Sequence, residues 1–272
     1  MHEIFLCPVC GGILSESEKL YRCAKNHSFD KARSGYVNLL SVRQKHAKLP
    51  GDNAEMVRAR RDFLNHDYYQ HLQKSLCEAV LKYMPSGGVL LDAGCGEGYY
   101  TRKISASLPE ESSCLGIDIS KSAADLAARA DKKTRYAVGS VFHLPVGDQK
   151  IDLLVSVFAP YCGSEFLRVL KSGAYLIMVI PSAKHLWELK TAVYDQPYEN
   201  QVRDYALDGF AFREKIISEK EIFISDPEDI QNLFQMTPYA YRTSAHERER
   251  LEKLQSLHVR TDFEILIYQK EA

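Results

Sequence analysis

Short apolar runs, separated by turns and amphipathic stretches, alternate along the chain from residue 86 to the end. Four of these runs are largely apolar rather than alternating, and they span residues 89–91, 115–119, 151–158 and 175–180, with Asp118, Asp152 and Ser156 as their polar residues. Largely apolar runs of this length are typical of strands buried on both faces of a parallel sheet. The pattern therefore predicts an α/β fold in which strands and helices follow one another.

Helical periodicity marks other segments. Residues 52–64 place Met56, Ala59, Arg60 and Phe63 on one face, with Asp52 or Asn53 available as the cap. Further helices are predicted over residues 68–83, 185–194, 227–234 and 246–256. Strands are predicted over residues 219–224 and 258–269, and a turn over residues 171–174. No pattern assigns residues 195–218 or 236–246.

A glycine turn follows the first apolar run. Asp92, Gly94, Gly96 and Gly98 occupy alternate positions, and a helical pattern begins at Tyr100. Glycines leave space where a chain turns tightly and approaches a ligand, and such turns form clefts at the carboxyl ends of parallel strands. The spacing differs from the dinucleotide fingerprint G-x-G-x-x-G. It resembles the first motif of class I S-adenosylmethionine (SAM) methyltransferases, although a turn without a ligand is the alternative.

Two polar residues follow the next strands. Asp118 ends the run 115–119, where a carboxylate can accept hydrogen bonds from both hydroxyls of a ribose. A solvated loop aspartate is the alternative for this position. Ser140 follows another short apolar run and resembles the residue that meets the adenine edge in the SAM-dependent superfamily.

The composition is that of an ordinary globular protein, with 45% hydrophobic and 26% charged residues. A length of 272 residues is enough for one large core plus a small appendage. The net charge of −1 hides an asymmetry, because residues 1–61 carry 11 Lys and Arg against 6 Asp and Glu. A basic head on an acidic body points to an anionic partner at the head.

Two sequence features bear on cellular location. No run of 18 apolar residues exists, and the first residues lack the pattern of a secretory signal, so no membrane span and no export are expected. Seven cysteines, four of them spread singly through the body, suggest reduced thiols. The sequence therefore predicts a cytoplasmic protein.

The first 30 residues carry a metal-binding pattern. Cys7 and Cys10 form a C-x2-C pair, and Cys23 and His27 follow after twelve intervening residues. This spacing is typical of zinc sites in which short strands carry the ligands, here near residues 4–6 and 19–22. A redox pair at Cys7 and Cys10 is the alternative, but it needs a helix start beside it. Four protein ligands would make the site closed and structural, and the metal would supply folding energy.

Basic and aromatic residues follow the zinc pattern. Lys and Arg lie close to Phe29, Tyr36 and His46, which suits single-stranded or looped RNA because cations meet phosphates and rings stack on bases. The basic residues of this stretch are Lys31, Arg33, Arg43, Lys45, Lys48, Arg58, Arg60 and Arg61. A solvated linker is the alternative explanation.

Taken in order, the motifs resemble one family over essentially the whole chain. They are the four-ligand head, Gly35-Tyr36-Val37-Asn38-Leu39-Leu40, Pro50-Gly51-Asp52, Ala59-Arg60-Arg61, Gly94 to Tyr100, Ala159-Pro160, His185 to Lys190, Met236-Thr237-Pro238 and Thr261-Asp262-Phe263. The whole is similar to the RlmA-type 23S ribosomal RNA guanine-N1 methyltransferases. The resemblance implies a zinc-ribbon head for RNA, a Rossmann-like catalytic domain whose last strands form an antiparallel edge, and a homodimer with an RNA cleft.

The resemblance also implies site residues. SAM contacts are expected at Tyr69, in the Tyr100-Thr101 turn and at His185, beside those at the glycine motif. Asp92, Glu97 and Asp118 are also interpreted as cofactor contacts. Tyr69 could instead cover the core, His185 cap a helix and Tyr100 pack on the sheet. The expected organisation is a zinc-binding head (1–35), a basic linker with helices (36–85) and a class I SAM-dependent methyltransferase domain (86–272).

The expected reaction moves the methyl group of SAM to N1 of a guanine in a hairpin loop of 23S rRNA. N1 lies on the Watson–Crick edge, so the target base must be looped out or flipped. Guanine N1 carries a proton that must be removed, and the sequence gives only His185 and Tyr161 as weak candidates for that role. Methylation of another RNA or of a small molecule is the alternative, and so is an inactive RNA-binding protein.

Overall fold

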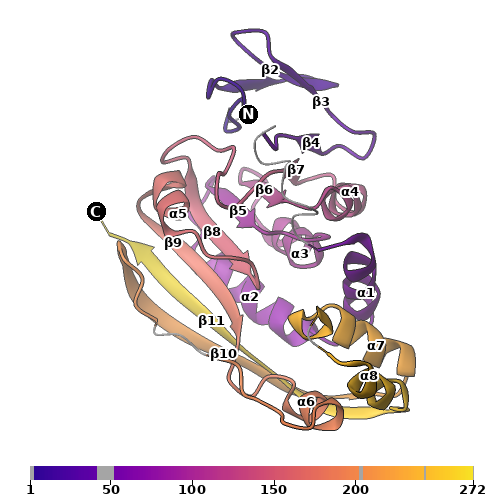
Figure 1. The fold of residues 1–272 in the computed structure, drawn as a ribbon. Helices are drawn as coiled ribbons and strands as arrows, with labels where there is room; N and C mark the ends of the chain where they lie inside the picture. Colours follow the sequence, from indigo (N-terminus) through magenta and orange to yellow (C-terminus); the bar gives the residue numbers. More distant parts are fainter. Residues whose placement is uncertain (1–2, 42–51, 202–204, 242, 272) are drawn as a thin grey trace.

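The computed structural model describes residues 3–41, 52–201, 205–241 and 243–271, and it contains one large and one small sheet. The large sheet has eight strands in the order β10-β11-β9-β8-β5-β6-β7-β4. Their bounds are β4 Val37–Asn38, β5 Val89–Ala93, β6 Ser113–Asp118, β7 Arg135–Val138, β8 Ile151–Val157, β9 Leu170–Pro181, β10 Phe210–Ile224 and β11 Leu257–Lys270. Figure 1 shows the small sheet at one end of the molecule and helices α6, α7 and α8 at the other.

The strands predicted from apolar runs pair in parallel. β5 lies between β6 and β8, and β9 follows β8 in the same direction. β11 pairs antiparallel with both β9 and β10, which confirms the antiparallel edge that the resemblance implied. Because parallel strands point the same way, the loops after β5, β6 and β8 meet at one edge of the sheet.

Helices cover both faces of the large sheet. They are α1 Ala54–Asn65, α2 Gln70–Tyr83, α3 Tyr99–Ser107, α4 Lys121–Ala130, α5 Gly163–Val169, α6 Trp187–Val193, α7 Pro227–Gln235 and α8 Ala245–Glu252, with a short 3-10 turn at Pro238–Tyr241. Side chains of α1, α2, α3, α6 and α7 share one core with β8, β9 and β11. A second core lies on the other face of the sheet, where α5 and the amino-terminal residues pack.

The predicted helices are present, with bounds shifted by a few residues. The α1 cap is Asn53, whose side-chain oxygen accepts hydrogen bonds from the backbone N–H groups of Glu55 and Met56. Asp226 caps α7 in the same way, with Pro227 in the first turn. None of the described helices is long and apolar enough to span a bilayer.

Two predictions for strands were wrong in part. The turn expected at residues 171–174 is continuous strand within β9, although Leu170 pairs with Ile151 and Tyr175 with Leu153, so the ladder is irregular there. β10 begins at Phe210, nine residues before the predicted start. Much of β10 is exposed on both faces, so polar residues interrupt the apolar pattern on which the prediction depended.

The small sheet is a ribbon of three antiparallel strands, β1 Leu14–Glu16, β2 Leu20–Cys23 and β3 Ser28–Asp30. The strand expected at residues 19–22 is β2, whereas residues 4–6 form only isolated bridges. One of these bridges joins Phe5 to Val146 in the large domain. The chain then joins the large sheet directly, because β4 pairs in parallel with β7. The ribbon is therefore anchored to the α/β body at two places.

Candidate functional site

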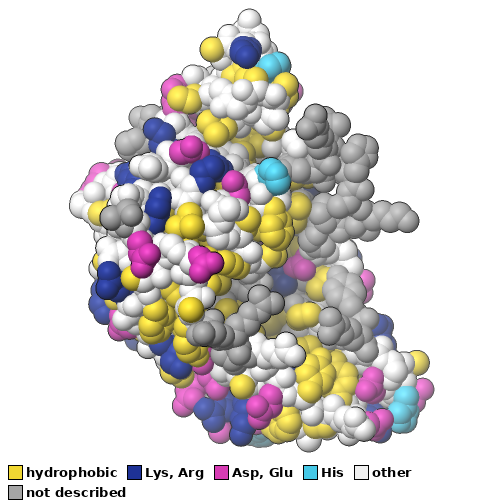
Figure 2. All heavy atoms as spheres, turned by 60° about the vertical axis from the view of Figure 1, so that its left-hand side comes forward, with side chains coloured by type: hydrophobic (Ala, Val, Ile, Leu, Met, Phe, Trp, Pro, Cys, Tyr) yellow, Lys and Arg dark blue, Asp and Glu magenta, His cyan; other side chains and the backbone are white. Residues whose placement is uncertain are grey.

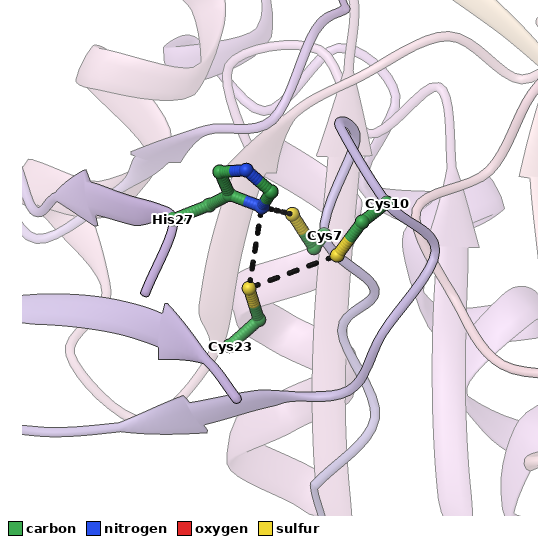
Figure 3. A group of neighbouring side chains, drawn as sticks. All are labelled: Cys7, Cys10, Cys23 and His27. Atoms are coloured by element: carbon green, nitrogen blue, oxygen red, sulfur yellow. Dashed lines mark hydrogen bonds between the residues drawn. The ribbon is translucent and has the colours of Figure 1, made fainter. Parts of the chain in front are cut away.

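The four predicted metal ligands come together at the base of the ribbon (Figure 3). One candidate ligand atom from each of Cys7, Cys10, Cys23 and His27 lies within 4.8 Å of the others. The Cys10 and Cys23 sulfurs are 3.7 Å apart, and His27 Nδ1 is 3.6 Å from Cys7 Sγ and 3.4 Å from Cys23 Sγ. Four donors therefore face one centre.

These separations are those of a tetrahedral zinc site. Zinc–sulfur bonds of about 2.3 Å and zinc–nitrogen bonds of about 2.0–2.1 Å give a tetrahedron with edges of about 3.8 Å between sulfurs and about 3.5 Å between sulfur and nitrogen. The donor set fits zinc and would present Nδ1 of His27 to the ion. With four protein ligands the site is structural, because no position remains for a substrate.

The glycine motif forms a tight loop between β5 and α3. Gly94, Gly96 and Gly98 all have positive φ, of 90°, 56° and 87°. A Cβ atom on Gly94 would lie 2.4 Å from the Cβ of Ala159, in the loop after β8. The absence of a side chain at Gly94 thus lets the ends of β5 and β8 approach each other.

Asp118 holds this loop in place at the end of β6. Its two carboxylate oxygens accept hydrogen bonds from the backbone N–H groups of Gly96 (2.9 Å) and Ser120 (2.7 Å). Burial raises the pKa of Asp118, while these two N–H groups oppose the rise. Each carboxylate oxygen has a second acceptor position, so the side chain can also receive ligand hydroxyls.

Asp92 is the most deeply buried carboxylate of the motif, with 1% exposure. Thr101 Oγ1 donates to Asp92 Oδ2 at 2.6 Å, and Asp92 Oδ1 has no hydrogen-bond partner among the described residues. Burial raises the pKa of Asp92 to about 7; the Thr101 hydrogen bond opposes the rise and the charge of Asp118 adds to it. An acceptor without a partner in such a site is open to a donor from a ligand.

A cavity of about 370 Å³ lies at the carboxyl ends of β5, β6 and β8. Seven of the predicted cofactor residues line it, and they are Asp92, Gly94, Gly96, Glu97, Tyr100, Asp118 and Ser140. Gly98 and Thr101 do not line the cavity: Gly98 is the N-cap of α3, and Thr101 within α3 donates a hydrogen bond to Asp92.

A second cavity, of about 500 Å³, adjoins the first. Tyr69 and His185 line this second cavity and not the first. Aromatic side chains contribute much of its wall, including Phe158, Tyr239 and Phe263. The two cavities share six lining residues, which are Asp52, Arg60, Leu64, Tyr100, Phe158 and Ala159.

The imidazole of His185 accepts a hydrogen bond at one ring nitrogen and can donate one from the other. The backbone N–H of Asp262 donates to His185 Nδ1 at 3.1 Å. Burial lowers the pKa of His185 to about 3, with added effects of Lys190 and His71. A neutral imidazole whose Nδ1 is an acceptor carries its proton on Nε2. The hydroxyls of Tyr69 and Tyr100 are also buried and lack partners among the described residues.

Several lining residues were not predicted as site residues. Phe158 follows β8 with a positive φ of 53° and 46% exposure, which is unusual for a bulky residue. Arg60 was expected on the core face of α1, but its guanidinium forms an ion pair with Asp52 and donates to the carbonyl oxygen of Met236 (3.2 Å). The sequence signal was weak for both residues: Arg60 is a charged residue, and Phe158 an aromatic one, at a position of the apolar pattern.

Other predicted features lie elsewhere. Tyr161 lines neither cavity and packs its ring against Phe166. Arg43, Lys45, His46 and Lys48, expected to contact RNA, fall outside the described residues. On the face in Figure 2, Lys and Arg side chains are interspersed with Asp and Glu over the broad body below the ribbon.

Comparison with known proteins places these features in a family. A family model described as "RlmA, N-terminal" matches residues 5–48, and a model described as "Methyltransferase domain" matches residues 90–173. A protein of Micromonospora griseorubida named "Putative 23S rRNA (guanine-N(1)-)-methyltransferase" is 38% identical over 202 residues, which are 67% of each chain. A Bacillus subtilis protein named "Putative 23S rRNA (guanine-N(1)-)-methyltransferase YxjB" is 28% identical over 98% of each chain.

A solved structure shares the fold. The crystal structure of the [4+2]-cyclase SpnF superposes with a TM-score of 0.50 and 16% identity, covering 73% of this chain and 80% of that one. At this identity the likeness concerns the fold alone. It supports the α/β architecture.

Proposed function

Because the chain belongs to the family of 23S rRNA (guanine-N1)-methyltransferases, we propose that it transfers the SAM methyl group to N1 of a guanine in a hairpin loop of 23S rRNA. SAM supplies an activated methyl group, so the protein has mainly to bind, orient and deprotonate. The observation that carries this proposal is the pair of adjoining cavities at the carboxyl edge of the sheet.

The first cavity suits SAM. Asp118 can accept hydrogen bonds from the ribose hydroxyls, because each of its oxygens uses only one acceptor position for the loop. Ser140 and the half-exposed ring of Phe142 line the same cavity and would meet the adenine. The unpartnered Oδ1 of Asp92 would accept from the amino group of the methionine portion.

The second cavity suits a flipped base. Its aromatic wall offers faces on which a purine can stack, and the flat ring of Phe158 stands at the boundary between the two cavities. The methyl carbon must lie close to guanine N1 and in line with the leaving sulfur. Two cavities with a shared wall of Tyr100, Phe158 and Ala159 would bring these groups together.

The assignment of Tyr69 and His185 to cofactor binding stays a prediction. Both line the second cavity, so a contact with SAM would come from the part of the cofactor nearest the base. A tyrosine ring in that position is attracted to the positive sulfonium. The three-part division of the chain at residues 35 and 85 is likewise part of the proposal.

Three further parts of the proposal concern partners and location. The ribbon would bind RNA, because it stands out from the body and leads into the basic stretch of residues 43–61. The active form would be a homodimer, as the family resemblance implies. The protein would act in the cytoplasm, where its cysteines stay reduced, three of them as zinc ligands.

Methylation of purified RNA tests the function. The protein is incubated with labelled SAM and unmodified 23S rRNA, and in a parallel arm with an extract of small molecules. Label in RNA, and a block to reverse transcription at one guanine, is the expected result, because an N1 methyl prevents base pairing. Label only in small molecules would overturn the proposal. Sedimentation of the same sample with and without RNA tests the dimer.

A further inference from the structure

Asp52 stands at the junction of the two cavities, directly before α1. Its side chain lines both cavities and is 30% exposed. Arg60, which lies in α1 eight residues after Asp52, forms an ion pair with the Asp52 carboxylate. The backbone oxygen of Asp52 accepts a hydrogen bond from Ser120 Oγ at 3.2 Å, which fixes this residue to the loop after β6.

The described groups that line the second cavity offer few proton acceptors. The guanidinium of Arg60 has only N–H donors and no acceptor. Burial raises the pKa of both Tyr69 and Tyr100, so their hydroxyls keep their protons. His185 has no free ring acceptor, because its Nδ1 already accepts from the backbone N–H of Asp262 and its Nε2 then carries the proton. None of these four groups offers a base at neutral pH.

The carboxylates that line the two cavities also differ, with one exception. Asp92, Glu97 and Asp118 line the first cavity alone. Within the part of the chain that the structure describes, Asp52 is the carboxylate that also lines the second cavity. Its lone pairs remain available, because a carboxylate has about four acceptor positions and Arg60 uses only some of them.

We propose that Asp52 is the catalytic base that accepts the N1 proton of the target guanine, an inference that rests on the proposed function. As the nitrogen bonds to the methyl carbon, the carbon–sulfur bond breaks and its electron pair goes to sulfur. The N1 proton passes to an Asp52 oxygen, and its bonding pair stays with the ring. SAM, guanine and carboxylate thus become S-adenosylhomocysteine, N1-methylguanine and a neutral carboxylic acid, which releases its proton to solvent.

The surroundings of Asp52 suit this role. Arg60 from α1 faces it with a positive charge, and the carboxylate of Asp118 at the end of β6 faces it with a negative one. Tyr69, Tyr100 and His185 face the same cavity as neutral groups. N–H and O–H donors on the cavity wall would stabilise negative charge on the guanine carbonyl as the proton leaves.

The test compares Asp52→Asn with the wild type in single turnovers at saturating RNA and SAM. The rate of methyl transfer at neutral pH is expected to fall at least about 100-fold, the usual range for loss of a positioned base. The pH profile is the decisive readout. The wild-type rate should be level across the neutral range, whereas the variant rate should rise with pH there, because hydroxide must then remove the N1 proton. SAM affinity should stay close to the wild-type value.

Two control variants separate the base from a structural role. Arg60→Gln removes the ion pair but keeps the carboxylate, so it should retain the level pH profile of the wild type. Asp62→Asn removes a carboxylate that Arg61 contacts on α1, outside both cavities, and should leave the rate unchanged. An Asp52→Asn variant with the wild-type rate and profile would overturn the inference. The proposed function fails separately, if the wild type itself does not methylate guanine N1.

Discussion

The hydroxyl of Thr101, in the first turn of α3, donates a hydrogen bond to the carboxyl of Asp92 at the end of β5. The two buried oxygen atoms, Thr101 Oγ1 and Asp92 Oδ2, are 2.6 Å apart. The contact fixes one oxygen of the Asp92 carboxyl and leaves the other without a partner beside the first cavity. A residue that does not line the cavity thereby orients one that does.

The buried Asp92 should make stability depend on pH. In the folded protein the pKa of Asp92 is raised to about 7, chiefly by burial. An unfolded aspartate titrates near about pH 4, so between these values the folded state binds more protons and stability falls as pH rises. The Asp92→Asn variant has no carboxyl that titrates at this position, so it does not lose stability in this way as pH rises. Its free energy of unfolding relative to the wild type should increase, by on the order of a few kcal/mol, between about pH 5 and about pH 8.

Denaturant unfolding of both proteins without SAM, at the two pH values, measures this difference. Titrations that are the same in both proteins cancel in the comparison. A difference that does not change with pH would mean that Asp92 is ionised in the folded protein at both values.

Gly94→Ala should damage the cofactor loop. The new methyl group would meet Ala159 at 2.4 Å, and the positive φ of 90° is strained for alanine. We expect a loss of about 1–3 kcal/mol in the free energy of unfolding, together with a marked loss of SAM affinity measured by calorimetry.

Gly87→Ala is the matched control for Gly94→Ala. Gly87 has a φ of 65°, but an added Cβ would meet only Glu111 Cγ at 3.7 Å, and Gly87 does not line the first cavity. It should lose some stability from backbone strain and keep its SAM affinity. Equal effects on SAM affinity in the two variants would contradict the close approach of Gly94 to Ala159 as the cause.

Zinc removal should act on the ribbon first. One zinc ion per chain is expected by elemental analysis, and Cys10→Ser or a chelator should unfold the ribbon. SAM affinity should persist, because the cofactor cavity is lined by residues of the α/β body. Cys162→Ser changes a free cysteine outside the cluster and should retain the metal. A protein without zinc, or RNA affinity untouched by the chelator, would contradict the ribbon's role.

Charge removal in the basic stretch should affect RNA and spare SAM. Changing Arg43, Lys45 and Lys48 to Gln together should flatten the slope of log affinity against log salt, by about 0.7 for each lost phosphate contact and roughly 2 in all. Asp118→Ala is the converse variant, with SAM affinity reduced by about 1.5–3 kcal/mol and the salt slope retained. An unchanged slope in the triple variant would make the stretch a solvated linker and move the RNA contacts to the α1 arginines.

Local spacing determined the features that the sequence predicted. The strand, glycine loop and helix around Asp92 are contiguous, so hydrophobic pattern and glycine position are enough to define them. The four metal ligands lie within about twenty residues, as two pairs in one short ribbon. Such a ribbon allows few arrangements in which the two pairs face each other. Family resemblance then supplied the reaction, because the same motifs recur in the same order.

Tertiary structure alone decided the second cavity and the junction. Tyr69, His185 and Phe263 come from three distant segments, and no periodicity brings them to one wall. Arg60 occupies a core-facing position of α1 by pattern, yet its long side chain reaches the boundary of both cavities and pairs with Asp52. Which residue meets the reacting atoms is set by the packing of α1 and α7 against the sheet edge. A one-dimensional pattern records the apolar faces of these elements but not the polar groups that their contact brings together.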